Sequence, residues 1–237
     1  METVELLPNL HMLRFPVGAA YLWSEPGTGP GDRALTLIDT GAAGSGEGIA
    51  AAVRGLGHDP ADIGQVVLTH FHHDHTGSAA EIRAWGGAAV LAHRLEAPVI
   101  RGEAAGAPPV FADWERAIFD SLPPLPPAPP VEVDRELEDG DTLGFGGGAE
   151  VVWVPGHTDG SIAIHLPGPR ILFTGDTAAN VEGHTMPGVF NSDPARALAS
   201  FHRLAALDVD VACFGHGDPI TGGAAAALRG AVAGSGG

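Results

Sequence analysis

The 237-residue sequence has few of the cysteines, basic residues and long apolar runs on which several classes of protein depend. Cys213 is the single cysteine, so no disulfide can form within the chain, and its apolar neighbours predict a small buried side chain. Residues 1–8 carry two glutamates and no basic residue, and no apolar run is long enough to span a membrane. These absences predict a cytoplasmic protein without a signal peptide or a transmembrane helix.

Basic residues are also scarce, with 12 Lys plus Arg against 29 Asp plus Glu and a formal net charge of −17. No local cluster of basic residues offsets this charge, which would repel a phosphate backbone. A nucleic-acid partner is therefore not expected, nor is a membrane partner, and a small-molecule substrate is favoured. Bound divalent ions would cancel part of the acidic excess.

Short apolar runs separated by turn residues predict a mixed α and β chain, and its size and 44% hydrophobic content favour one domain over residues 1–237. Strands are expected over residues 4–7, 12–15, 19–23, 34–38, 65–69, 88–91, 150–154, 162–166, 170–173 and 209–214. Helices are expected near 78–85, from Pro194 with Asp193 as N-cap, and from Thr221 onward into a flexible tail over 231–237.

The densest group of chemically active residues follows the strand expected over 65–69. His70, His72, Asp74 and His75 lie within six positions, in a loop that leaves the end of the strand. One metal ion would not accommodate all four from so tight a turn, so the spacing predicts two adjacent ions. A solvated polar loop is the alternative.

Three more residues of ligand type each follow an expected strand in a glycine-containing loop, namely His157, Asp176 and His216. Each alone is a common loop residue. Together they supply a third histidine for one ion, a further histidine for the second, and a carboxylate able to bridge both.

In these motifs the chain resembles the metallo-β-lactamase superfamily, whose signature His-x-His-x-Asp-His matches the first group and whose later motifs occur in the same order. The resemblance implies an α/β (α+β) fold of the αββα sandwich type and two zinc ions per chain, with iron, manganese and cobalt as alternatives. It assigns His70, His72 and His157 to the first ion, Asp74, His75 and His216 to the second, and Asp176 to both.

Asp39 matches a position near the site in this family, where it would orient a ligand histidine. A turn former at the end of a strand is the equally simple alternative. Asp176 at the bridging position resembles the glyoxalase II and lactonase branch, because many true β-lactamases place Cys or Ser there.

This branch implies a dinuclear hydrolase in which a metal-bridging hydroxide attacks a carboxylic ester, lactone or thioester. Asp74 is the candidate catalytic residue, since it would orient the hydroxide and take its proton. Alternatives are an iron-dependent persulfide dioxygenase with one iron, a β-lactam hydrolase, and a binding protein that keeps metal for stability. Phosphodiester cleavage would need a basic surface that the sequence lacks.

Residues 98–130 hold nine of the 20 prolines and are interpreted as an insertion that stays outside the core. An amphipathic helix over 110–122 is expected to place its apolar residues on one side, Phe111, Trp114, Ile118 and Phe119. We expect this segment to form a lid with Trp114 in contact with substrate; a dimer contact is the alternative, so both monomer and homodimer stay open. His184, in a loop eight residues after Asp176, is the second candidate for substrate binding.

Overall fold

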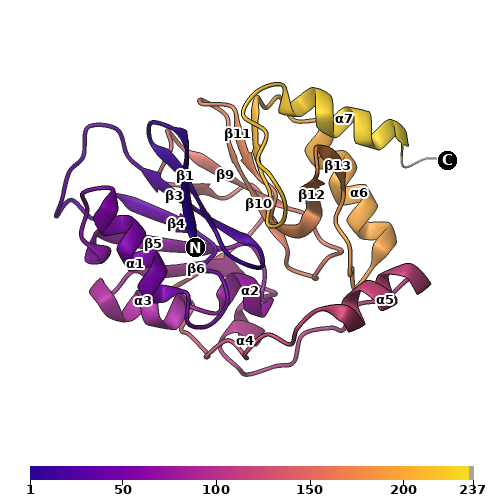
Figure 1. The fold of residues 1–237 in the computed structure, drawn as a ribbon, viewed down its shortest axis with the longest axis horizontal. Coiled ribbons are helices and arrows are strands. Elements are labelled where there is room, and N and C mark those ends of the chain that lie inside the picture. Colours follow the sequence, from indigo (N-terminus) through magenta and orange to yellow (C-terminus); the bar gives the residue numbers. More distant parts are fainter. Residues whose placement is uncertain (235–237) are drawn as a thin grey trace. The chain divides into compact units, whose positions relative to one another are not determined.

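The computed structural model describes residues 1–234 and divides the chain into two compact units (Figure 1). Unit 1 comprises Met1–Ala104 and Leu125–Leu137, and unit 2 comprises Ala105–Pro124 and the chain from Glu138 onward. Each unit has its own sheet and its own hydrophobic core. The mixed α and β class is confirmed, and the single domain over 1–237 stays a prediction.

Unit 1 contains a seven-stranded sheet whose strands lie in sequence order. They are β1 (Glu2–Leu7), β2 (Leu10–Arg14), β3 (Ala19–Ser24), β4 (Leu35–Ile38), β5 (Ile63–Leu68), β6 (Ala89–His93) and β7 (Arg135–Leu137). The first four are antiparallel, and β4 to β7 are parallel. The carboxyl ends of β4, β5 and β6 therefore meet at one edge of the sheet.

The helices of unit 1 are α1 (Gly46–Gly55), η1 (Pro60–Asp62), α2 (His73–Thr76), α3 (Ala79–Gly86) and α4 (Ala97–Ile100). Figure 1 shows α1 and α3 beside one another. Ile49 and Val53 of α1 and Ile82 of α3 are buried in one core with alternate residues of the strands, such as Leu37 and Val66. Within each strand the residues of this core alternate, Leu35 with Leu37 in β4 and Val66 with Leu68 in β5.

Unit 2 contains a five-stranded sheet in the order β14-β11-β10-β9-β8 and a separate hairpin of β12 and β13. The strands are β8 (Thr142–Leu143), β9 (Ala149–Trp153), β10 (Ile162–Leu166), β11 (Ile171–Phe173), β12 (Ala178–Val181), β13 (His184–Pro187) and β14 (Val211–Cys213). Both β9 and β11 are antiparallel to β10, and β14 is parallel to β11. The strands β9, β11 and β14 thus end at the same edge.

The helices of unit 2 are α5 (Asp113–Ser121), η2 (Gly175–Thr177), α6 (Pro194–Ala205) and α7 (Ala224–Gly234). The expected start of α6 is confirmed, because the Asp193 side chain accepts a hydrogen bond from the Arg196 amide and Pro194 is the first helical residue. Phe201 of α6 and Leu228 of α7 are fully buried in the core of this unit.

Most expected strands are confirmed with ends shifted by one or two residues, and three expectations need correction or restriction. The segment 98–130 is not wholly outside the core, because Ile100 is buried in unit 1. Residues 231–234 of the tail expected over 231–237 are helical instead, because α7 continues to Gly234, and residues 235–237 lie outside the described part. The helix expected over 110–122 is confirmed as α5 but is shorter, since it covers Asp113–Ser121 and Phe111 precedes it.

Within residues 1–234, no helix has both the length and the apolar character that crossing a membrane requires. Cys213 is fully buried, as expected, and its burial raises the pKa of the thiol well above its usual value.

Candidate metal centre

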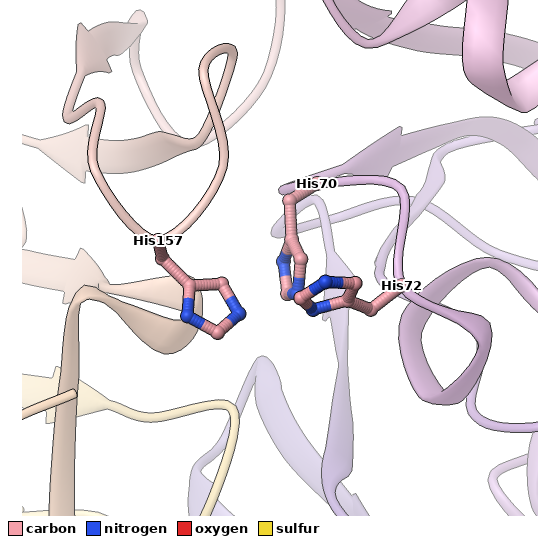
Figure 2. A group of neighbouring side chains, drawn as sticks. All are labelled: His70, His72 and His157. Atoms are coloured by element: carbon pink, nitrogen blue, oxygen red, sulfur yellow. The ribbon is translucent and has the colours of Figure 1, made fainter. Parts of the chain in front are cut away.

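The first group of ligand-type residues follows β5, with His70 and His72 in the loop and Asp74 and His75 in the short helix α2 instead of the expected loop. His70 and His75 are buried, whereas His72 and Asp74 are less completely buried. The Nε2 atom of His70 lies 3.0 Å from Nδ1 of His72, and Figure 2 shows these two rings close together at the end of the strand. Ligand atoms of His75 lie within 4.8 Å of those of His70 and of Asp74. Unit 1 therefore gathers all four predicted residues at one place.

Asp39, directly after β4, holds this loop in place. Its Oδ1 accepts a hydrogen bond from the Thr69 amide at 2.8 Å, and its Oδ2 accepts from Thr69 Oγ1 and from His75 Nδ1, each at 2.8 Å. The backbone of Asp39 has φ 60°, an uncommon conformation outside glycine that short polar residues tolerate. Because a carboxylate only accepts, His75 carries its proton on Nδ1 and its lone pair on Nε2. The structure thus confirms that Asp39 orients a histidine of the motif.

Thr69 orients His70 in a similar way, because it contacts both Asp39 and His70. The single hydroxyl proton of Thr69 is donated to Asp39, so its oxygen accepts from His70 Nδ1 at 3.0 Å. His70 then presents the lone pair of Nε2 toward Nδ1 of His72. Two imidazole nitrogens facing one another at this distance need a shared proton or a cation between them, so the arrangement fits a metal ion.

Two further residues support the loop and were missed in the sequence. Glu96 is buried and accepts a hydrogen bond from the Phe71 amide at 2.7 Å. The amide and hydroxyl of Thr40 both donate to the His75 carbonyl, at 2.7 and 2.8 Å. Thr40 lies two residues after β4, and Glu96 lies three residues after β6. Their positions just after strand ends could have identified them as residues near the site.

Unit 2 brings together the other three predicted residues because β9, β11 and β14 end at one edge. His157 extends from the loop after β9 (Figure 2), Asp176 lies in η2 after β11, and His216 follows β14. The Oδ2 atom of Asp176 lies 3.5 Å from His157 Nε2 and 3.2 Å from His216 Nε2. The carboxylate therefore stands between the two histidines.

The loop between β13 and α6, residues 188–193, supports His157 and was not identified from the sequence. Val189 O accepts a hydrogen bond from His157 Nδ1 at 3.1 Å, and the Ser192 amide donates to His157 O at 3.1 Å. Gly188 passes so near Asp176 that an added Cβ would lie 1.8 Å from the Asp176 carbonyl oxygen, so only glycine fits there.

The two candidates for substrate binding are both exposed. Trp114 is 55% exposed on α5, and His184 is exposed at the start of β13. Phe119 of α5 and Phe111, which precedes the helix, lie near Phe190, with ring centroids 5.4 and 6.0 Å away, yet Phe119 remains exposed, like Trp114. The expected lid and the roles of Trp114 and His184 stay predictions.

The donor chemistry of both units suits a transition metal. Imidazole nitrogens and carboxylate oxygens are the ligands that zinc takes when no thiolate is offered, and Cys213 is buried. His75 and His157 each donate their second ring nitrogen to a fixed oxygen, as ligand histidines usually do. The residues present therefore fit metal ions.

Comparison with curated proteins finds relatives that are named hydrolases. The chain is 28% identical over 240 residues to the probable metallo-hydrolase YflN of Bacillus subtilis (strain 168), covering 92% of this chain and 87% of that protein. It is 35% identical over 153 residues to a hydroxyacylglutathione hydrolase of Fuscovulum blasticum, covering 64% of this chain. The chain spans only 47% of that second relative.

Comparison with solved structures confirms the fold. A metallo-beta-lactamase family protein from Thermus thermophilus has a TM-score of 0.68 and 26% identity, over 98% of this chain and 80% of that one. A metallo-beta-lactamase of Cronobacter sakazakii has a TM-score of 0.69 and 25% identity, over 91% of this chain and 80% of that one. The family model described as "Metallo-beta-lactamase superfamily" matches residues 28–216. This match includes the ligand-type residues of both units, and the chain belongs to the metallo-beta-lactamase superfamily.

Proposed function

We propose that the protein is a dinuclear metallo-hydrolase that cleaves a carboxylic ester, a lactone or a thioester. The observation that carries the proposal is the position of Asp176, whose Oδ2 faces the Nε2 atoms of His157 and His216. A carboxylate placed between two histidines is suited to bridge two ions. In the proposed centre one ion takes His157 and the other takes His216.

The remaining ligands come from the loop and the short helix α2 that follow β5. We assign His70 and His72 to the ion of His157, and Asp74 and His75 to the ion of His216. The facing nitrogens of His70 and His72 support the first assignment, and the 3.8 Å separation of His75 Nε2 from Asp74 Oδ2 supports the second. Zinc is the proposed metal, with iron, manganese and cobalt as alternatives.

Bound divalent ions would supply hydroxide near neutral pH, because they lower the pKa of water to about 7, and would polarise the substrate carbonyl. Asp74 orients the attacking water and accepts its proton, since its carboxylate adjoins His75 within the motif. Asp39 and Thr69 keep the histidines in the tautomers that direct ligand nitrogens toward the centre. No serine or cysteine nucleophile is required.

We base the proposed substrate class on the carboxylate at position 176 and on the relatives named hydroxyacylglutathione hydrolase. A dioxygenase with one iron and a β-lactam hydrolase are the competing activities within the same ligand pattern. We also propose a cytoplasmic location, a small-molecule substrate without nucleic-acid or membrane partners, and a monomeric or homodimeric state.

Metal content and a substrate panel test this function together. Purified protein is expected to contain about two zinc ions per chain, because seven ligand-type residues exceed what one four-coordinate ion uses. Removal of metal by a chelator should abolish hydrolysis of the best lactone or thioester, and added Zn²⁺ should restore it. A single iron per chain together with oxygen consumption would contradict the hydrolase, and preference for β-lactams would contradict the substrate class.

Trp114→Ala tests the lid over the proposed centre. If the exposed indole contacts the non-reacting part of the substrate, its loss should raise KM by about tenfold while kcat stays within about tenfold, as for uniform binding. Steady-state kinetics on two substrates and metal analysis check this result, with Trp114→Phe as the matched variant that keeps an aromatic ring. An unchanged KM with a dissociated oligomer would instead identify α5 as an interface.

A further inference from the structure

The peptide bond between Val189 and Phe190 is held at both of its polar ends. Its carbonyl, Val189 O, accepts the hydrogen bond from His157 Nδ1 at 3.1 Å. Its N–H, on Phe190, donates to Glu115 Oε1 at 3.0 Å. Because the peptide unit is planar and rigid, the partner of the N–H also fixes the direction of the carbonyl. A carboxylate on α5 thus controls the group that orients a candidate metal ligand.

The backbone at this peptide would not hold its conformation without such contacts. Phe190 has φ 58°, which is a rare conformation for a bulky residue and persists only where the surroundings impose it. Its ring packs against Phe111 and Phe119 of residues 111–121, here called the α5 segment, and its amide is bound by Glu115. The α5 segment therefore supplies both the apolar and the polar contacts that impose the strained turn.

Glu115 differs from the other acidic residues of its helix. It is 7% exposed, while Asp113 and Asp120 lie in solvent. Its Oε2 accepts from the Ala112 amide at 2.8 Å, the ordinary bond of a glutamate at the third position of a helix. A glutamate that only capped the helix could stay exposed to solvent. Glu115 is buried, and its other carboxylate oxygen, Oε1, accepts the hydrogen bond from the Phe190 amide.

The consequence for His157 lies in its tautomer. A carbonyl oxygen only accepts, so Nδ1 of His157 carries the proton and Nε2 presents its lone pair on the side of Asp176, 3.5 Å away. We propose that Glu115 is a positioning residue that, through the Val189–Phe190 peptide, fixes the orientation and tautomer of His157 for metal binding. The metal part of this inference rests on the proposed function, whereas the tautomer part does not.

Glu115→Ala removes both bonds and is the main test, with Asp120→Ala as control, because Asp120 is an exposed carboxylate on the same helix. We expect Glu115→Ala to weaken Zn²⁺ affinity, measured by competition with a chelator, by about 10-fold, the lower end of the effect for direct partners of ligand histidines, because Glu115 acts through one peptide. Asp120→Ala should bind Zn²⁺ like the wild type. In metal-free protein, ¹⁵N NMR should show His157 as one Nδ1–H tautomer in the wild type and as a mixture in Glu115→Ala.

Ala112→Pro separates the helix cap from the contact with Phe190. Ala112 has φ −69°, close to the proline value, so this change removes the N–H donated to Oε2 and leaves the bond to Phe190. Zn²⁺ affinity should then equal that of the wild type. A loss as large as in Glu115→Ala would show that helix stability alone is responsible, and would overturn the proposal.

Unchanged Zn²⁺ affinity and an unchanged tautomer in folded Glu115→Ala would also overturn it. Should that variant fail to fold, Glu115→Gln replaces it. Gln has one acceptor oxygen, whereas the Ala112 and Phe190 amides each donate to a separate oxygen of Glu115. Its Zn²⁺ affinity must then fall below that of Asp120→Ala for the proposal to stand. Wild-type protein that binds no metal would refute the proposed function, while the tautomer comparison would still decide the role of Glu115.

Discussion

Replacement of His70 by Ala is expected to leave about one metal ion per chain and to lower kcat by about 10³-fold or more. His70 is buried, and its Nε2 lies 3.0 Å from Nδ1 of His72, so the change removes one of the two facing nitrogens. Each factor of ten in rate corresponds to about 1.36 kcal/mol, and loss of a Lewis acid removes several kcal/mol of transition-state stabilisation. Elemental analysis and steady-state kinetics measure the two effects.

His73→Ala is the matched control for this experiment, because His73 lies between the ligand-type residues His72 and Asp74 but is exposed. Its Nδ1 accepts a hydrogen bond from the Ala128 amide at 3.2 Å. This contact is with the proline-rich residues 98–130 and not with a ligand-type residue. Metal content and kcat should stay close to the wild type. Two ions and normal turnover in His70→Ala would exclude this histidine from the centre.

Replacement of Asp176 by Ala is expected to lower the occupancy of both ions and kcat together. A bridging carboxylate neutralises charge on two ions at once and sets their separation, so its loss affects both. The same change leaves the nitrogens of His157 and His216 without the oxygen that lies 3.5 and 3.2 Å from them. We expect fewer than one ion per chain after dialysis and a fall in kcat of about 10²-fold or more, in line with other lost electrostatic groups.

Two further variants test whether the effect comes from the charge of Asp176. They are Asp176→Asn and the control Asp208→Ala. Asn keeps the shape of the side chain without its charge, so it should show the same direction of change if charge is responsible. Asp208 is an exposed carboxylate paired with Arg170, and its loss should change neither metal content nor kcat. Full occupancy and full activity in Asp176→Ala would refute the bridging assignment.

The ligand-type residues could be found from the sequence because they follow strands whose apolar patterns are clear. His70 follows the buried end of β5, and Asp176 and His216 follow the parallel strands β11 and β14. Parallel neighbours end at the same edge, so strand position and residue type together predict proximity. The N-terminus of α6 was equally clear, since Asp193 and Pro194 are local signals.

The supporting contacts could not be found in this way, because they depend on segments far apart in the sequence. Glu115 binds an amide 75 residues away, and Glu96 binds one 25 residues away. Local patterns carry no information about such partners. The contact of Phe190 with Phe111 and Phe119 was missed for the same reason, since these rings come from segments far apart in the sequence.

The chain passes from unit 1 into unit 2 at α5 and then back into unit 1, and this path has a consequence for folding during synthesis. Residues 105–124 belong to unit 2, yet the chain then returns to unit 1, where β7 and the side chains of Val131 and Val133 complete the sheet and the core. A nascent chain ending at residue 104 would therefore expose β6 as an unpaired edge, a feature that favours aggregation. Neither unit is a continuous piece of the chain, so we expect them to fold cooperatively and not in N-to-C order.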